Sequence, residues 1–318
     1  MNCERLPSRA GVLAAAERVG AFVTRTPLLP FEWQGRRIWA KAECLQQGGA
    51  FKLRGATNRL LQLSAEERGR GVVAFSSGNH ARGVAIAARR LGITATIVMP
   101  ADAPAVKREA TAAEGARIIP YDRLTEDRIA IARRIADESG AVVVPSFDDV
   151  DIIEGQGTAG LEIAEQLGGD PPVVIVPCGG GGLSAGIALA LPNSTVIPVE
   201  PAGWDDMARS LEAGSILPVE SSAPPTRLDA LQTPLVSPLT FAVLQDRSAR
   251  GLSVTDAEAA AAMRFAFDWL RLVVEPGGAA ALAALLTGKA GDVPEGSVVL
   301  LSGGNVDPGY YAAVIADR

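Results

Sequence analysis

The chain has 318 residues, of which 48% are hydrophobic and 21% are charged, and its formal net charge is -6. This composition supports a large buried core in two domains or one large unit, and it excludes a disordered chain. The acidic balance argues against nucleic acid as a partner, and no apolar run is long enough to span a membrane. Three cysteines without metal-ligand spacing and an N-terminus without a secretory signal pattern predict a cytoplasmic protein.

Short β-branched runs alternate with helical stretches along the chain. The expected strands are residues 72–75, 95–99, 116–120, 142–145, 173–177, 196–200 and 298–301. The expected helices between them are residues 79–91, 105–114, 125–139, 152–167 and 183–191. Apolar strands separated by helices predict an α/β fold with mostly parallel sheets covered on both faces. The proline- and serine-rich stretch 213–237 is expected to be a loop.

Small polar residues and glycines follow three of these strands, at residues 76–79, 178–182 and 302–305. Ligands of open α/β folds bind beyond the carboxyl ends of the strands. We therefore expect these three segments to converge on one cleft.

Lys52 stands between Phe51 and Leu53, where a helix is expected to begin. Loss of solvation and the positive end of the helix would both lower its pKa. The neutral amine of such a lysine is the nucleophile of Schiff-base formation. The alternative is an ordinary surface lysine on a helix.

His80 is the only histidine in the chain. This excludes a Ser-His-Asp hydrolase and a histidine-rich zinc enzyme. We expect His80 to brace its loop rather than to act as an acid or a base.

The glycine run 179–182 follows an expected strand and opens an expected helix. Such a run lets backbone N–H groups approach a phosphate at a helix N-terminus. No Gly-Lys-Ser/Thr follows, so it is not a P-loop. Gly180, Gly182 and Ala185 also match dinucleotide spacing, with Glu200 as a possible ribose ligand, and a nicotinamide oxidoreductase stays an alternative. The other alternative is that the glycine run forms only a tight turn.

Taken together, Lys52, residues 76–80, residues 179–182 and residues 302–305 resemble the fold-type II pyridoxal-phosphate enzymes, in particular the serine/threonine dehydratase and serine racemase group. The supporting strings are residues 121–123, 126–128, 146–149, 155–158 and 275–279. The resemblance covers nearly the whole chain. It implies a tryptophan synthase β-like α/β fold, with two open parallel-sheet domains and pyridoxal 5'-phosphate in the cleft between them.

The implied domains are a large cofactor-binding domain, residues 1–66 and 148–318, and a small domain, residues 67–147. The chain ends at Arg318, which leaves no room for the regulatory domain of biosynthetic threonine dehydratases. The resemblance also implies a homodimer.

The resemblance further implies roles for individual residues. Lys52 forms the Schiff base and later acts as the general base, and Ser77 stands at the position of the racemase's opposite-face acid/base. Asn79 binds the ring oxygen of the cofactor, Phe51 packs on the pyridine ring, and Ser302 faces the pyridine nitrogen. The expected phosphate ligands are Gly179, Gly180, Gly181, Gly182 and Leu183. The expected substrate-binding segment is Ser76, Ser77, Gly78, Asn79 and His80.

A cation site is implied at Glu200, the backbone carbonyl of Trp204, and Asp206. Hard oxygen ligands suit Mg²⁺ or Ca²⁺. Trp204 departs from the small residue that is usual there, and the alternative is a solvated acidic turn.

The implied activity is elimination of water from L-threonine, L-serine or a related β-hydroxy amino acid, which gives a 2-keto acid and ammonia. A serine opposite the pyridine nitrogen makes the ring a weaker electron sink than a carboxylate would, which favours elimination over transamination. The alternatives are serine racemase activity, a dehydratase for β-hydroxyaspartate or in hydroxyectoine breakdown, and a β-replacement synthase of the cysteine-synthase kind.

Overall fold

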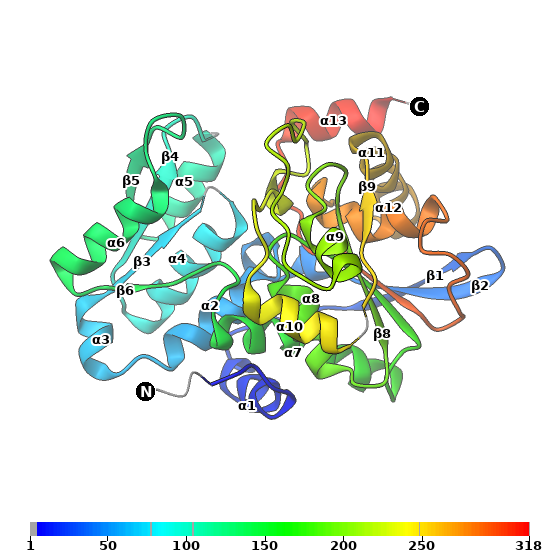
Figure 1. Cartoon of the computed structure of the whole chain (residues 1–318), viewed down its shortest axis with the longest axis horizontal. Coiled ribbons are helices and arrows are strands. Elements are labelled where there is room, and N and C mark those ends of the chain that lie inside the picture. The colour runs from blue at the N-terminus through cyan, green and yellow to red at the C-terminus, as the bar shows by residue number, and fades with distance from the viewer. Residues whose placement is uncertain (1–4, 77, 104, 248, 318) are drawn as a thin grey trace.

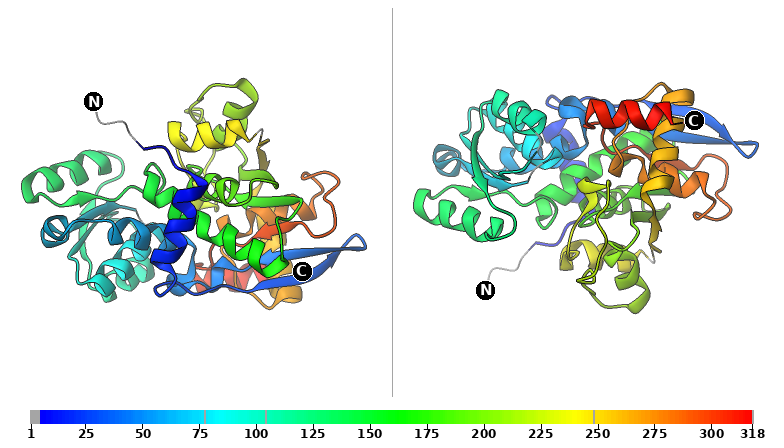
Figure 2. Two further views of the ribbon diagram at one scale, coloured as in Figure 1. Left: turned by 90° about the horizontal axis from the view of Figure 1, so that it is seen from below. Right: turned by 90° about the horizontal axis from the view of Figure 1, so that it is seen from above.

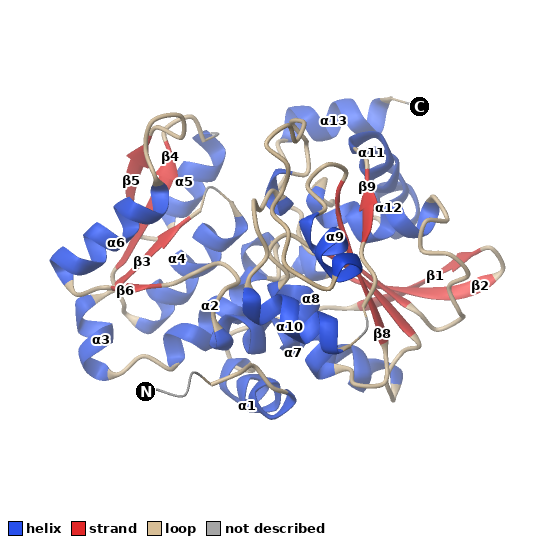
Figure 3. Cartoon of the chain, in the orientation of Figure 1, coloured by secondary structure: helices blue, strands red, loops and turns tan. Residues whose placement is uncertain are grey.

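The computed structural model of the chain describes residues 5–76, 78–103, 105–247 and 249–317. Two β-sheets lie toward opposite ends of the long axis, each flanked by helices (Figure 1). Loops crowd the region between the two sheets (Figure 3). The prediction of an α/β fold with mostly parallel sheets is confirmed.

Helices and strands alternate along most of the chain. The helices are α1 (Arg9–Val19), α2 (Lys52–Leu61), α3 (Ala65–Arg70), α4 (Asn79–Leu91), α5 (Ala105–Ala113), α6 (Arg128–Ser139), α7 (Val150–Leu167), α8 (Gly182–Ala190), α9 (Asp206–Ala213), α10 (Pro238–Asp246), α11 (Asp256–Phe265), α12 (Ala280–Leu286) and α13 (Pro308–Ala316). The strands are β1 (Leu28–Trp33), β2 (Arg36–Lys41), β3 (Val72–Phe75), β4 (Ala95–Pro100), β5 (Arg117–Tyr121), β6 (Val142–Val143), β7 (Val173–Pro177), β8 (Thr195–Pro201), β9 (Leu252–Val254) and β10 (Val298–Leu300).

The smaller sheet has the strand order β5-β4-β3-β6, and all its neighbouring strands are parallel. Side chains alternate between its two faces, as the pleat requires. On β3, Val72 and Ala74 join the core beneath α2 and α4, whereas Val73 joins a second core that includes Ala132 of α6. Both faces are therefore covered, which explains the continuous apolar runs.

The larger sheet has the order β1-β2-β10-β7-β8-β9. Alanine-rich α12 and α11 cover one face, and α7, α8 and α10 contribute to the core on the other. Figure 2 shows α1 crossing the molecule beside α7. The N-terminal segment is tied to α7 because Arg5 pairs with both Asp151 and Glu154.

The sequence analysis missed the antiparallel pair β1 and β2, as well as the short β9. The first two strands meet at Gln34 and Gly35, whose φ angles of 50° and 74° are those of a tight hairpin turn. Pro30 and charged residues interrupt the apolar pattern of β1 and β2, so their signal was weak.

The expected strand 142–145 was too long, since β6 ends at Val143. The carbonyl oxygen of Val144 bonds to the ring of His80, and Pro145 has no N–H to donate. The smaller sheet spans residues 72–143, and the division of the chain at residues 67 and 147 stays a prediction. Within the described ranges, no helix is long and apolar enough to cross a membrane.

Candidate active site

A cavity of about 660 Å³ is lined by loops that follow strands of both sheets. This volume suits a small-molecule ligand. Its wall includes every predicted cofactor- and substrate-binding residue that the structure describes: Phe51, Lys52, Ser76, Gly78, Asn79, His80, Gly179, Gly180, Gly181, Gly182, Leu183 and Ser302. The predicted second acid/base, Ser77, lies outside the described residues. The segments expected to converge on one cleft do meet there.

Lys52 begins α2, and its Nζ donates a hydrogen bond to the carbonyl oxygen of Ser146 at 2.8 Å. The same atom lies 5.1 Å from the centre of the Phe51 ring. Because burial removes the ammonium form from water, the pKa of Lys52 falls to about 8. Lys52 can therefore present a neutral amine to the cavity near physiological pH.

The backbone before Lys52 is joined to the loop that carries Ser302. The N–H of Phe51 donates to the carbonyl oxygen of Ser302 at 3.1 Å, and Ala50 forms a β-bridge with Gly303. Lys52 and the buried Ser302 are thus held in one site although 250 residues separate them in the sequence.

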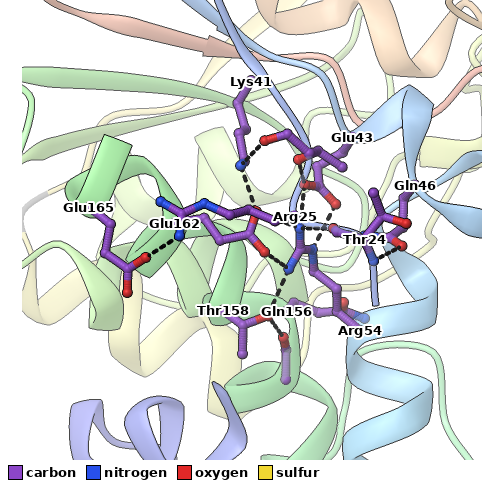
Figure 4. Close-up of polar contacts among 12 residues, drawn as sticks. Thr24, Arg25, Lys41, Glu43, Gln46, Arg54, Gln156, Thr158, Glu162 and Glu165 are labelled. Carbon is purple, nitrogen blue, oxygen red and sulfur yellow. Dashed lines mark hydrogen bonds and ion pairs between the residues drawn. The ribbon is translucent and has the colours of Figure 1, made fainter. Parts of the chain in front are cut away.

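A buried ionic network surrounds Arg54, which lies on α2 together with Lys52 (Figure 4 shows the network). Arg54 is fully buried, and its guanidinium binds Glu43 at 2.8 Å and Glu162 at 2.7 Å. Lys41 reaches the other oxygen of Glu162 at 2.6 Å. Burial alone would raise the pKa of Glu43, but Arg54 holds that pKa below its usual value. Two cations and two carboxylates thereby fix α2, and with it Lys52, against α7.

Asn79 lies at the start of α4 and has both ends of its side-chain amide engaged. Its Nδ2 donates to Glu275 Oε1 at 2.6 Å, and its Oδ1 accepts from Asn305 Nδ2 at 2.8 Å. Asn305 is itself held, since it donates to the carbonyl of Gly48 at 2.7 Å and accepts from Arg82 at 3.0 Å. These bonds assign the orientation of the Asn79 amide and leave its second N–H directed to no other described residue.

Glu275 is buried, and burial raises its pKa to about 7, although the hydrogen bond from Asn79 acts in the opposite direction. The sequence analysis named residues 275–279 and 302–305 without giving Glu275 or Asn305 a role. No spacing rule connects two residues 226 positions apart, such as Asn79 and Asn305. Only the fold reveals that they touch.

The glycine loop joins β7 to α8, and its lack of side chains permits a ligand to come close to the backbone. Gly181, the residue before α8, has a φ of 87°, a conformation that favours glycine. A Cβ on Gly180 would lie 2.4 Å from the ring of Phe147, which lines the same cavity. The hydroxyl of Thr240 donates to the carbonyl of Gly180 at 2.8 Å and fixes the loop from behind. A glycine loop of this shape at the N-terminus of α8 is chemically suited to hold a phosphate.

His80 is buried, and its Nε2 lies 2.9 Å from the carbonyl oxygen of Val144. Burial lowers its pKa to about 3, so the ring is neutral and Nε2 carries the donated proton. The contact joins α4 to the segment after β6. Such a neutral, hydrogen-bonded ring braces the wall of the cavity.

The three residues of the predicted cation site, Glu200, Trp204 and Asp206, do not line the cavity. The carboxylate of Glu200 accepts from the backbone N–H groups of Met207 at 3.0 Å and Ala208 at 2.8 Å. Asp206 Oδ2 is buried and has no hydrogen-bond partner among the described residues. The indole of Trp204 donates to the carbonyl of Pro224 at 2.7 Å, so the side chain is turned toward residue 224.

This geometry bears on two alternatives. The buried, orphaned oxygen of Asp206 beside a second carboxylate is consistent with a cation ligand. Glu200 was also the ribose ligand of the dinucleotide alternative, but it is fully buried away from the cavity. That alternative is left without its ribose partner in the described structure.

The site fits pyridoxal phosphate in its chemistry. It offers a desolvated lysine amine, a glycine cradle that a Cβ would fill, a preoriented amide N–H and a hydroxyl at Ser302. The cavity also has room for an amino-acid substrate beside the cofactor.

Comparison with known proteins agrees with this chemistry. The family model described as "Pyridoxal-phosphate dependent enzyme" matches residues 19–304. The L-threo-3-hydroxyaspartate ammonia-lyase of Saccharomyces cerevisiae is 41% identical over 321 residues, which cover 98% of each chain. The serine racemase of Schizosaccharomyces pombe is 38% identical, over 96% of this chain and 97% of its own.

Solved structures give the same result. The threonine deaminase of T.th. superimposes with a TM-score of 0.88 at 41% identity, covering 95% of this chain and 99% of its own. Maize serine racemase superimposes with a TM-score of 0.91 at 35% identity, covering 98% of both chains.

Proposed function

Since the chain belongs to the family of pyridoxal-phosphate dependent enzymes, we propose that it removes water from a β-hydroxy amino acid and releases a 2-keto acid and ammonia. The observation that carries this proposal is the Lys52 amine, which faces the same cavity as the glycine cradle and Asn79. Relatives named as ammonia-lyases for hydroxyaspartate and threonine support the reaction type.

Pyridoxal phosphate, when bound, supplies the electron sink that stabilises negative charge at the substrate's α-carbon. Lys52 holds the cofactor's aldehyde carbon and is also the base that takes the α-proton, for which a pKa of about 8 is suitable. The loop 76–79 binds the substrate carboxylate at the N-terminus of α4. Within this loop, Ser76 Oγ accepts a hydrogen bond from the N–H of Gly78 at 3.2 Å.

The remaining N–H of Asn79 would hold the ring oxygen of the cofactor, and the N–H groups of Gly179 through Leu183 would hold its phosphate. Ser302 lines the cavity and would offer the ring nitrogen a neutral hydroxyl rather than a carboxylate. A neutral partner there would make the ring a weaker electron sink than a carboxylate would, which favours loss of the β-hydroxyl over transamination.

The test is a panel of β-hydroxy amino acids assayed for 2-keto acid and ammonia, with wild type and Lys52→Ala. Wild type should be yellow and release keto acid from at least one member of the panel, and Lys52→Ala should lose more than about 10³-fold in kcat. Lys289→Ala is the matched control, because Lys289 lies on the surface and pairs with Glu258. Unchanged turnover in Lys52→Ala would falsify the assignment.

A second candidate, racemisation of serine, is favoured by relatives named as serine racemases. It requires an acid/base on the face opposite Lys52, the role predicted for Ser77. Ser77→Ala should then abolish D-serine formation from L-serine while keto acid release continues.

Three further features belong to this proposal. We propose Mg²⁺ or Ca²⁺ binding by Glu200, Asp206 and the carbonyl of Trp204, supported by the unpartnered oxygen of Asp206. We also propose a homodimer and a cytoplasmic location, as the family resemblance and the cysteine content indicate.

A further inference from the structure

The long loop between α9 and α10, residues 214–237, forms one wall of the active-site cavity. We call this loop the strap; it runs through the crowded region between the two sheets (Figure 1). The strap forms one short 3₁₀ turn, Asp229–Leu231, and is otherwise irregular. Its residues 229–237 line the cavity, whereas its residues 214–228 do not. The proposed reaction gives the strap no role.

The part of the strap that faces the cavity is backed by the part that does not. Leu231 and Val236 are buried in the core, but residues 232–235 between them are half-buried or exposed. The carbonyl oxygen of Pro234 accepts a hydrogen bond from the N–H of Val219 at 3.0 Å. The position of this wall therefore depends on the segment behind it, residues 217–224, which we call the outer segment.

The outer segment is bound to α9 at its beginning. Arg209 of α9 donates to the carbonyl oxygen of Pro218 at 2.6 Å and lies 3.5 Å from Glu220. The N–H of Leu217 donates to Ser210 Oγ at 2.9 Å. Irregular segments with little buried surface open at a low free energy, so such contacts decide how firmly the outer segment is held.

Trp204 holds the other end of the outer segment. Its indole N–H donates to the carbonyl oxygen of Pro224 at 2.7 Å. A Cβ on Gly203 would lie 2.6 Å from the ring of Pro224, so this proline packs directly on the backbone before Trp204. A small side chain at position 204 would have no donor for the bond to Pro224.

Neither Trp204 nor Arg209 lines the cavity, so each can act on a bound molecule only through the strap. The expected cofactor ligands, among them Lys52, Asn79 and the glycine loop, all lie outside the strap. The position of the strap should therefore affect the amino-acid substrate and leave the cofactor unaffected. The proposed cation site uses only the backbone carbonyl of Trp204, which leaves the indole without a role.

Resting on the proposed function, we propose that Trp204 and Arg209 are positioning residues for the substrate. They hold the outer segment and, through the bond from Val219 to Pro234, the wall against which the substrate binds. A wall that is in place only part of the time reduces the apparent affinity for the substrate by that fraction. Loss of either side chain should therefore raise KM without changing kcat or the affinity for the cofactor.

The experiment compares the wild-type holoenzyme with Trp204→Phe, Arg209→Met and Trp269→Phe. Trp204→Phe removes the indole N–H but keeps an aromatic ring and the backbone carbonyl, so no ligand of the proposed cation site is lost. Trp269→Phe is the matched control, because Trp269 is exposed, stacks on Phe265 and does not line the cavity.

We measure kcat and KM for the β-hydroxy amino acid that wild type turns over fastest. The Kd of L-alanine, followed by visible absorbance, reports binding alone, since L-alanine has no β-hydroxyl to lose. Titration of the apoprotein gives the Kd of pyridoxal phosphate. Hydrogen exchange followed by mass spectrometry reports how firmly the strap is held.

Trp204→Phe and Arg209→Met should each raise KM and the Kd of L-alanine about 2- to 10-fold, as expected for the loss of one hydrogen bond. Their kcat and their Kd for pyridoxal phosphate should change by less than about 2-fold. Amide exchange should become faster in residues 217–236 and stay unchanged in α8. Trp269→Phe should match wild type in every measurement.

Two results overturn this inference. In the first, both variants keep the wild-type KM and the wild-type Kd of L-alanine. In the second, the Kd of pyridoxal phosphate rises as much as KM, which would show a general loosening of the site. Neither result affects the proposed elimination reaction. If no β-hydroxy amino acid is turned over, the proposed function fails, and the Kd of L-alanine together with hydrogen exchange still decides the role of Trp204 and Arg209.

Discussion

The side-chain amide of Asn305 donates to the side-chain oxygen of Asn79 at 2.8 Å, and so determines which end of the Asn79 amide faces Glu275. Asn305 follows β10 in the larger sheet, whereas Asn79 follows β3 in the smaller one. One hydrogen bond therefore joins the two halves of the site and orients a group predicted to touch the cofactor.

Asn305→Ala should weaken cofactor binding without unfolding the protein. The variant frees the Asn79 amide to rotate, so its N–H points at the ring oxygen only part of the time. We expect the Kd of pyridoxal phosphate to rise up to about 10-fold, since a single hydrogen bond contributes about 0.5–1.5 kcal/mol. Titration of the apoprotein by visible absorbance measures this change, and an unchanged Kd with an unchanged spectrum would contradict it.

Glu275→Gln should alter how the stability of the apoprotein depends on pH. The folded-state pKa of Glu275, about 7, lies above the usual value of 4.5, so the folded state binds the proton more tightly. Wild type therefore loses stability as pH rises from about 4.5 to 7, and the loss is complete above pH 7.

The glutamine variant lacks this loss. The free energy of unfolding of the variant should match that of wild type below about pH 4.5 and should exceed it above pH 7, by at most about 3 kcal/mol. Urea unfolding at pH 4.5, 6 and 8 gives the comparison. Parallel stability curves for the two proteins would show that Glu275 titrates normally.

Gly180→Ala should damage the phosphate cradle. The added methyl group would lie 2.4 Å from the Phe147 ring, so the loop or the ring must move. We expect the Kd of pyridoxal phosphate to rise about 10-fold or more, as several N–H donors lose their alignment. Gly169→Ala is the control, because a Cβ there meets nothing within 4 Å. Equal affinities in the two variants would exclude a tight cradle at Gly180.

Arg54→Met should destabilise the fold strongly. It would leave the fully buried Glu43 beside an apolar side chain and would remove one of the two cations that bind the half-buried Glu162, at a cost of about 3–5 kcal/mol in the free energy of unfolding. Arg25→Met tests an exposed pair with Glu165, drawn in the same cluster in Figure 4, and should cost less than about 1 kcal/mol. Chemical denaturation measures the free energy of unfolding of both variants. Similar losses in Arg54→Met and Arg25→Met would refute the structural role of Arg54.

Asp206→Asn should remove stabilisation by divalent cations. Wild type should gain about 5 °C in Tm at a Mg²⁺ or Ca²⁺ concentration 100 times the Kd, because the cation binds only the folded state. The exposed Asp246→Asn variant should respond as wild type does. If Asp206→Asn gains as much as wild type, Glu200 and Asp206 do not form the site.

Much of the fold could be read from the sequence because most strands are buried on both faces. Runs such as 72–75 and 173–177 carry a strong apolar signal, and α4 begins and ends at the predicted residues. The sequence did not predict the hairpin of β1 and β2, since β1 is a partly exposed edge strand that mixes apolar and charged residues.

Some residues of the site could likewise be predicted from the sequence, and others could not. Residues predicted to contact the cofactor, such as Lys52 and the glycine loop, stand in local patterns that signal their chemistry. Residues that orient them, such as Arg54, Glu275 and Asn305, look ordinary in sequence because their partners lie far along the chain. Arg128, which also lines the cavity, was named only within residues 126–128 and without a role, since only the fold brings α6 to the cavity.

The pairing of Arg54 with Glu162 also constrains the order of events during synthesis. Lys52 and α2 leave the ribosome before Glu162, which follows Arg54 by 108 residues, and the whole sequence of the smaller sheet is made in between. Until α7 emerges, Arg54 lacks one of its two carboxylate partners and its site cannot close. The helix that bears Lys52 therefore lacks a complete ionic network until Glu162, 108 residues after Arg54, has been translated.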